Sequence, residues 1–143
     1  MLSQSSEFAL RAVVFLAEGH GQPNTVAAIS AATKIPGEAV AAVLTVLADG
    51  GLVSQRADGD QFVLLRSPQD VTMYEVVHCV NPITRITTCP LDIGEHGSNL
   101  CSLHRRLDNL MAAVETALRR MTIAQLLVEA ESNKPLCGFP HRA

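Results

Sequence analysis

The spacing of apolar residues in the first fifty positions predicts three helices. Apolar residues recur three and four positions apart between Ser5 and Glu18, which is typical of a helix with one buried face. Thr25 is a suitable N-cap for a second helix of small residues from Val26 to Thr33. A third helix is predicted from Pro36, as its first residue, to about Ala48, and the segment Asp49-Gly50-Gly51 ends it.

Two short strands and a fourth helix are predicted next. Residues 52–56 and 61–66 flank a turn rich in Gly and Asp, which is typical of a β-hairpin. The segment Thr72-Met73-Tyr74-Glu75 has the pattern of a capping box and opens a helix that reaches about Val80. Three helices followed by a hairpin is the order of a winged helix-turn-helix, whose third helix normally enters the DNA major groove. We therefore expect residues 1–80 to form a DNA-binding region.

The second half of the chain predicts a loop, a long helix and a short one. Residues 81–101 lack periodicity and form a candidate sensor loop, since long irregular segments inside a domain are usually functional. Residues 102–131 contain a long helix and, from the capping box at Thr122, a last helix to about Ala130. Residues 132–143 are expected to form a loose tail. The long helix has an apolar stripe at nearly heptad spacing, made by Leu103, Leu107, Leu110, Met111, Val114, Leu118 and Met121. Such a seam favours pairing with a second copy of the chain. The expected fold is one mainly α domain with a small β-hairpin wing and a dimerisation helix.

Composition narrows the class of protein. The chain has 143 residues, 48% of them hydrophobic and 17% charged, which suits one folded domain that needs no disulfides. No apolar run approaches the roughly 20 residues that span a bilayer. Because Met1-Leu2-Ser3-Gln4 has no basic residue, we expect no secretory signal and a cytoplasmic protein. P-loop, GxGxxG, HExxH and GxSxG motifs are absent, which argues against an enzyme.

The cysteines supply the candidate chemistry. In a reducing compartment, thiols serve as metal ligands or redox switches more often than as disulfides. Cys89 and Cys101 bracket the predicted loop, and His104 follows Cys101 by three residues, so it lies on the same side of a helix. Thiolate and imidazole together suit iron in clusters or zinc. Cys79, on an apolar helix face, is expected in the core, whereas Cys137 lies in the predicted tail.

Five segments in the same order match motifs of one family. They are Glu7-Phe8-Ala9-Leu10-Arg11-Ala12, Gly50-Gly51-Leu52-Val53, Arg66 to Val77, Cys101-Ser102-Leu103-His104, and Met121 to Leu127. Over residues 1–130 the chain thus resembles the Rrf-two family of bacterial winged-helix regulators, the IscR, NsrR and CymR type. The resemblance implies a homodimeric transcriptional repressor that binds double-stranded operator DNA. Its DNA contacts would be made by Lys34, Gly37, Glu38, Ala41, Arg56 and Gln61.

The resemblance also implies a cofactor near the dimer interface. Many members of the family hold an iron–sulfur cluster with three cysteines in the loop before the long helix. Here the position of the middle cysteine is taken by Glu95, so the all-cysteine set is incomplete. We expect a 2Fe-2S cluster that senses redox state, nitric oxide or iron–sulfur status. Its ligands would be Cys89, Cys101, His104 and Glu7 of the partner subunit, with Glu95, His96 and Cys137 in reserve.

Two alternatives remain open at this point. In the first, the same fold works without a metal, and Cys89, Cys101 and Cys137 form a thiol switch. In the second, the chain is a protein-interaction module, with zinc or no metal, that does not read DNA. Charge favours the second, because residues 1–80 contain four basic and eight acidic residues, a net charge of −4 within the −3 of the whole chain. The predicted third helix has no basic residue, and the wing, Arg56 to Phe62, lacks the family's paired glycines. We therefore expect weak or state-dependent DNA affinity.

Overall fold

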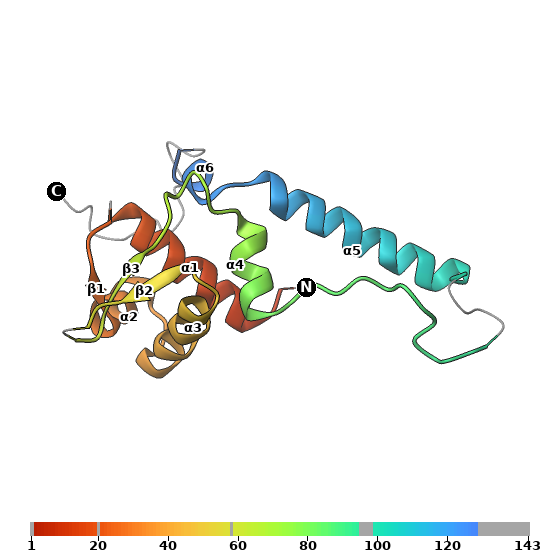
Figure 1. Ribbon diagram of the computed structural model, residues 1–143, viewed down its shortest axis with the longest axis horizontal. Helices are drawn as coiled ribbons and strands as arrows, with labels where there is room; N and C mark the ends of the chain where they lie inside the picture. The colour runs from red at the N-terminus through yellow and green to blue at the C-terminus, as the bar shows by residue number, and fades with distance from the viewer. Residues whose placement is uncertain (1, 20, 58, 95–98, 129–143) are drawn as a thin grey trace.

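The computed structural model describes residues 2–19, 21–57, 59–94 and 99–128, and it shows a winged-helix body from which one long helix projects (Figure 1). Its elements are α1 (Gln4–Glu18), β1 (Asn24–Thr25), α2 (Val26–Thr33), α3 (Gly37–Asp49), β2 (Val53–Gln55), β3 (Gln61–Leu64), α4 (Met73–Val80), α5 (Ser102–Arg120) and α6 (Ile123–Val128). This mainly helical fold with a small wing is the predicted one.

Helix α1 forms the centre of the body. Ser3 caps it, since the Ser3 Oγ accepts a hydrogen bond of 3.1 Å from the Ser6 backbone N–H. The run from Ala12 to Ala17 is apolar on every side and is buried throughout. Such a helix must be covered all round, and α1 packs against α2, α3, α4, α6 and β3.

The helix-turn-helix pair follows from two local features. The Thr25 Oγ1 caps α2 by accepting a hydrogen bond of 3.0 Å from Ala28, as predicted. Lys34 then adopts a left-handed conformation with φ of 58°, which ends α2 and turns the chain toward α3. The prediction that Pro36 is the first residue of α3 is wrong by one position, because Pro36 has an extended ψ of 137° and is the N-cap.

The wing is smaller than predicted and belongs to a three-stranded sheet. Strands β2 and β3 pair antiparallel, with Gln55 opposite Phe62, and both end short of the predicted limits. Strand β1 pairs with the other edge of β3, which gives the order β1-β3-β2. Sequence reasoning missed β1 because two residues are too short to show alternation.

Both predicted capping boxes are present, at the starts of α4 and α6, and these two helix starts lie next to each other. The Thr72 and Glu75 side chains cap α4 reciprocally, and Thr122 and Gln125 do the same for α6. A β-bridge between Thr72 and Thr122 places the two helix starts side by side. As a result α6 packs on α1, and Ile123 is fully buried.

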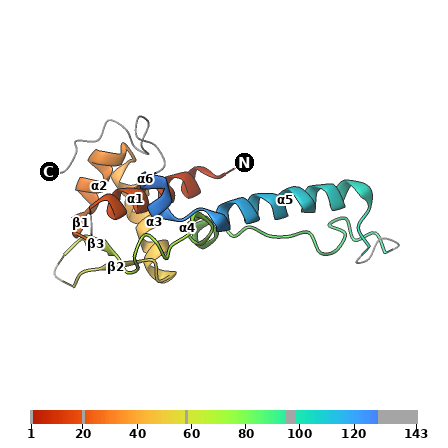
Figure 2. The same ribbon diagram turned by 90° about the horizontal axis from the view of Figure 1, so that it is seen from above.

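Helix α5 projects far beyond the rest of the body, and residues 81–94 run alongside it (Figures 1 and 2). Leu118, near its C-terminal end, is buried, and α5 packs there against α4. No single helix of the described residues is long and apolar enough to cross a membrane, although α2 and α3, bent by 114°, pass that test together. The predicted end of the last helix at Ala130 and the predicted tail 132–143 lie outside the described residues.

Candidate functional site

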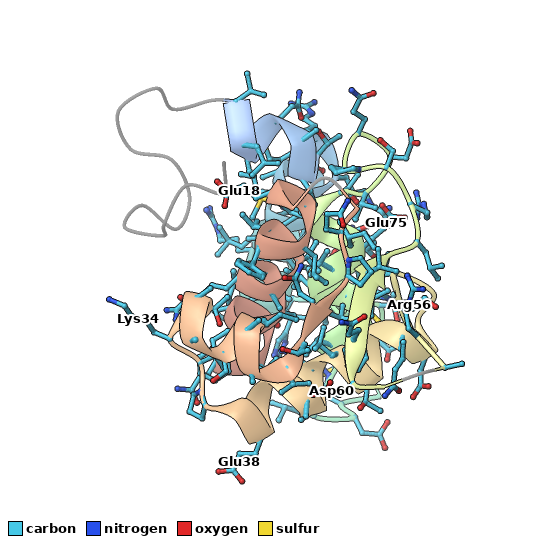
Figure 3. The ribbon with its side chains drawn as sticks, turned by 90° about the vertical axis from the view of Figure 1, so that its left-hand side faces the viewer. Glu18, Lys34, Glu38, Arg56, Asp60 and Glu75 are labelled. Carbon is cyan, nitrogen blue, oxygen red and sulfur yellow. The ribbon has the colours of Figure 1, made fainter. Side chains whose placement is uncertain are left out.

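The predicted DNA-contacting residues lie on the α2–α3 turn, on α3 and on the wing. Figure 3 shows Lys34 and Arg56 on opposite sides of the body, with Glu38 and Asp60 below them and Glu18 above them. The side chains of Lys34, Glu38 and Arg56 are exposed. The α2–α3 turn, α3 and the wing thus each present one exposed charged side chain.

The remaining three predicted contacts are less exposed. Gly37, Ala41 and Gln61 are each half-buried. Gln61 lies in β3, opposite Thr25, and its backbone carbonyl accepts a hydrogen bond of 2.8 Å from the Arg56 N–H, which closes the base of the wing. Its backbone is therefore part of the sheet.

The outward face of α3 is formed by small and acidic side chains. It consists of Glu38, Ala42, Thr45, Val46 and Asp49, all exposed, with Ala41 half-buried beside them. The opposite face, made by Val40, Val43, Leu44 and Leu47, is buried in the core. The Thr45 hydroxyl donates a hydrogen bond of 2.9 Å to the Ala41 carbonyl of its own helix.

The start of α3 is open. Within the described chain no side-chain oxygen caps α3. A Cβ added at Gly37 would meet Ser30 Oγ at 3.9 Å, an ordinary contact distance. Packing therefore does not require a glycine here, and the backbone N–H groups of this turn can approach an anion.

The candidate sensor pair lies at the beginning of α5. Cys101 is the N-cap of α5, and its Sγ lies 3.4 Å from Nδ1 of His104, one turn along the helix. Cys101 and Cys89 are half-buried and are not in a disulfide. Nowhere in the described ranges do three His, Cys, Asp or Glu residues come together in a geometry that could bind one metal ion. The structure thus unites Cys101 with His104 and does not add a third ligand from the same subunit.

Glu7 lies elsewhere in the subunit. It is on α1, which is well separated from the beginning of α5 (Figures 1 and 2). Its carboxylate accepts hydrogen bonds of 3.0 and 2.6 Å from Nε and Nη2 of Arg11. Both bonds end on Oε1, so they leave Oε2 available as a ligand. The reserve ligands Glu95, His96 and Cys137 lie outside the described residues.

An ion pair that the sequence did not reveal fixes the sensor segment to α5. Asp108 receives two hydrogen bonds of 2.7 Å from Arg85 and one of 2.9 Å from the Ile86 N–H. The hydrogen bond from Arg85 is the main reason that the pKa of Asp108 falls to about 2. Two residues before Arg85, the Ile83 N–H donates a hydrogen bond of 3.1 Å to Nδ1 of His78 on α4. Residues 83–86 are therefore held at both ends.

The start of that segment joins a stack of aromatic and charged groups. The rings of His78 and Tyr74 stack with centroids 4.9 Å apart. The Arg119 guanidinium, near the end of α5, lies 3.6 Å from the Tyr74 ring centroid, a cation–π contact. Helix α4 thereby contacts both the sensor segment and α5.

Cys79 belongs to the packing of the body, as predicted. It packs against the core and donates a long hydrogen bond of 3.4 Å to the Val46 carbonyl. Burial, with a smaller contribution from Asp49, raises the pKa of its thiol. A thiol with a raised pKa is a poor nucleophile, so Cys79 is unsuited to redox sensing.

Comparison with protein families identifies the class of protein. A family model described as "Rrf2: Iron-dependent Transcriptional regulator" matches residues 2–129. The chain belongs to the Rrf2 family. Members of this family are transcriptional regulators that bind DNA, and this confirms the predicted family and regulatory role. No curated protein sequence matches the chain.

Solved structures confirm the Rrf2 fold. IscR of T. potens is 18% identical, with a TM-score of 0.73, and the match covers 92% of this chain and 88% of that one. CymR of B. subtilis, described as a global cysteine regulator, is 18% identical, with a TM-score of 0.72 and coverage of 92% and 98%. The oxidized form of Staphylococcus aureus CymR is 14% identical, with a TM-score of 0.69 and coverage of 94% and 99%.

The description of the Rrf2 family names iron, so the question is whether the side chains of this chain could bind it. A thiolate beside an imidazole is a donor pair that iron in a cluster or zinc accepts. Cys101 and His104 form such a pair, but the described residues of one subunit offer no third donor next to it. Cys101 and His104 could therefore supply two ligands of a metal site, and the remaining ligands would have to come from elsewhere.

Proposed function

We propose that this Rrf2 protein represses transcription as a homodimer that binds operator DNA through α3 and the wing. The observation that supports this most is the exposure of Lys34, in the turn before α3, and of Arg56, directly after β2 in the wing; these are the two basic residues between positions 24 and 64. Phosphate contacts from Lys and Arg position a winged helix on a duplex. The open first turn of α3 can bind a further phosphate through backbone N–H groups.

The experiment for this proposal is enrichment of duplexes from a random-sequence pool by the full chain. The proposal predicts a recurring inverted repeat, because a symmetric dimer reads two half-sites. The Lys34→Ala/Arg56→Ala double variant should enrich no such repeat. If wild-type protein enriches duplexes no better than this double variant, DNA reading is refuted and the protein-interaction module is favoured. Arg106→Ala, at an exposed basic residue near the beginning of α5, is the matched control and should leave enrichment intact.

The long helix supports the homodimer. On α5, Leu103, Leu107 and Leu110 are 60%, 41% and 63% exposed, although leucines at this spacing form the seam of paired helices. A second copy of α5 is the partner with the same seam, and symmetric pairing would cover both at once. The proposed dimer therefore places two winged ends on one duplex.

We assign the sensing role to residues 81–101 together with His104. Cys101 and His104 already lie side by side, and Cys89 lies in the same segment. With Glu7 of the partner subunit, they are the proposed holders of a 2Fe-2S cluster, a group that exchanges single electrons when bound. The ion pair at Asp108 ties the segment to α5, so a change in the segment also acts on the helix that joins the subunits.

The cofactor proposal is tested on protein purified without air. The proposal predicts that this protein absorbs visible light and contains iron and sulfide in similar amounts. Cys101→Ala protein should lose the absorption, the iron and the sulfide. Cys79→Ala is the matched control, since Cys79 packs against the core, and it should keep the colour. A colourless, iron-free wild-type protein would refute the cluster.

A thiol switch is the second candidate, because Cys89 and Cys101 are half-buried cysteines of the same segment and are not in a disulfide. In this reaction the two thiols lose two electrons and two protons to peroxide, which becomes water, and one disulfide forms. Mass-spectrometric mapping after peroxide treatment of iron-free protein decides the matter. A crosslink that includes Cys89 or Cys101 favours the switch, and unlinked thiols refute it.

A further inference from the structure

The outward face of α3 offers almost no hydrogen-bond donor to a base. The helix contains no Lys, Arg, His, Asn or Gln, the side chains that most often read guanine or adenine. Its one hydroxyl on this face, Thr45, already donates its proton to the Ala41 carbonyl at 2.9 Å. What α3 can present to the major groove is therefore limited to hydrogen-bond acceptors and methyl groups.

The outward face of α3 has two carboxylate acceptors, Glu38 in its first turn and Asp49 at its C-terminal end, and Glu38 is the one beside the α2–α3 turn. It is exposed in the first turn of α3, and Figure 3 shows it projecting outward from the body. In the part of the chain that the structure describes, no ion pair or hydrogen bond engages this carboxylate. In the major groove, the base group that pairs with a carboxylate is the N4 amino group of cytosine.

Between Glu38 and Asp49, the exposed groups of this face are methyl groups, including those of Val46. Ala42 is exposed one turn beyond Glu38, Ala41 lies half-buried beside it, and Thr45 follows a turn later. Because the Thr45 hydroxyl is bonded inward, its methyl group is the part left for a ligand. In the major groove, such groups match the C5-methyl of thymine.

We propose that α3 selects a half-site in which a cytosine, bound through its N4 amino group by Glu38, is accompanied within a few base pairs by thymines whose methyl groups contact Ala42 and Thr45. This inference rests on the proposed DNA-binding function and names the DNA that the site selects. It also gives Glu38 two opposing effects. The carboxylate adds specificity for one base, while its negative charge weakens attraction to phosphates.

Selection from a random duplex pool tests the cytosine. Wild-type protein should prefer cytosine at one position of each half-site by about five- to tenfold. Glu38→Ala should abolish that preference and at the same time strengthen binding to unselected duplex. Glu38→Gln should move the preference toward adenine, which an amide can bind. Glu18→Gln removes the same charge from the other half of the body and should leave the preference unchanged.

Duplexes with modified bases test which atoms of the DNA are contacted. Replacing the adjacent thymines with uracil removes only the methyl groups and should weaken binding about two- to fourfold per contacted methyl. Replacing the paired guanine with 7-deazaguanine removes the N7 acceptor and should change affinity little. Loss of binding with 7-deazaguanine, or unchanged binding with uracil, would overturn the proposal.

The outcomes separate this inference from the function on which it rests. If no duplex is enriched at all, the proposed function fails and the inference falls with it. If duplexes are enriched but the cytosine preference is missing, or survives in Glu38→Ala protein, DNA binding stands and the reading by Glu38 is wrong.

Discussion

At the residue scale, the contact between Gly50 and Cys79 gives a sharp test of the packing. A Cβ at position 50 would lie 2.3 Å from the Cys79 Sγ, which Val46 holds by a hydrogen bond. Gly50→Ala should therefore lower the free energy of unfolding by about 1–3 kcal/mol, as overpacking does. Adding Cys79→Ala should restore most of the loss, because it removes the clashing sulfur. Urea unfolding of the single and double variants measures both effects.

Gly51 is the matched control for this cycle. Its φ of +74° is a conformation that side chains disfavour, while a Cβ there would meet nothing within 4 Å. Gly51→Ala should cost about 1 kcal/mol through backbone strain alone. Cys79→Ala should not rescue it. Equal rescue at both glycines would contradict the assigned contact.

Gly37 separates stability from DNA binding at one position. An added Cβ would contact Ser30 at 3.9 Å without a clash, and alanine restricts the unfolded chain more than glycine. Gly37→Ala should therefore raise the free energy of unfolding by about 0.4–1 kcal/mol. If the first turn of α3 lies against a phosphate, the same variant should bind duplex more weakly. Thermal unfolding and fluorescence anisotropy on the enriched duplex measure the two effects, and a loss of stability would contradict the open contact at Gly37.

Sequence reasoning at this scale succeeded for local signals and failed for distant contacts. Thr25, Thr72 and Thr122 were correctly placed as helix caps, because a cap depends on residues only a few positions away. Asp108 was not singled out, since its partner Arg85 lies 23 positions earlier in a segment without periodicity. Which residues meet across an irregular segment is decided by the packing of whole elements.

At the element scale, the attachment of residues 83–86 to α5 depends on pH. The ordinary pKa of Asp108 is 3.8, and Arg85 lowers it in the folded protein to about 2. A lowered carboxyl pKa stabilises the fold at pH values above about 4 and loses this effect as the pH falls toward 2. The Ile86 amide, which donates to Asp108, should thus lose protection from hydrogen exchange across that window.

Asp108→Asn should remove this pH dependence. The asparagine keeps an acceptor oxygen but loses the charge, so the Ile86 amide should exchange faster at neutral pH and change little on acidification. Glu18→Gln, which removes a carboxylate from the end of α1, is the control. Exchange followed by NMR would contradict the attachment if wild-type and Asp108→Asn proteins behaved alike.

The seam of α5 is the second prediction at this scale. Leu110→Lys places charge in the proposed dimer interface and should weaken self-association by about tenfold or more, since a buried leucine contributes about 1.5–3 kcal/mol. Leu65→Lys is the matched control, because Leu65 is 57% exposed after the wing, close to the 63% of Leu110. Sedimentation over a range of concentrations measures the dimer. Unchanged association of Leu110→Lys would show that α5 pairs by another face or not at all.

Helices were easier to predict from the sequence than strands or segment paths. The limits of α2 and α4 agree with their apolar periodicity and caps, because these signals lie within each helix. Strand β1 has two residues and exists through its pairing with β3. The path of residues 81–94 beside α5 is likewise fixed by contacts between elements, and apolar periodicity records no such contacts.

At the scale of the whole molecule, charge is the feature that bears most on function. The winged region has a net charge of −4 from residues 1–80, yet it belongs to a family of DNA-binding regulators. Glu18 lies above Lys34 and Arg56 in Figure 3, whereas Glu38 and Asp60 lie below them on the side of α3 and the wing. Glu38 remains on the reading face, where we assign it a base. Specificity here should therefore come with few phosphate contacts and modest affinity.

The salt dependence of duplex binding tests the central claim most directly, namely that this acidic winged end reads DNA as a dimer. Lys34 and Arg56 of two subunits supply four phosphate contacts, so log affinity for an enriched duplex should fall against log salt with a slope of about −4. Arg56→Ala should reduce the slope by about 2, one unit for each subunit. A duplex affinity that does not change with salt, or a slope that Arg56→Ala leaves unaltered, would contradict the account.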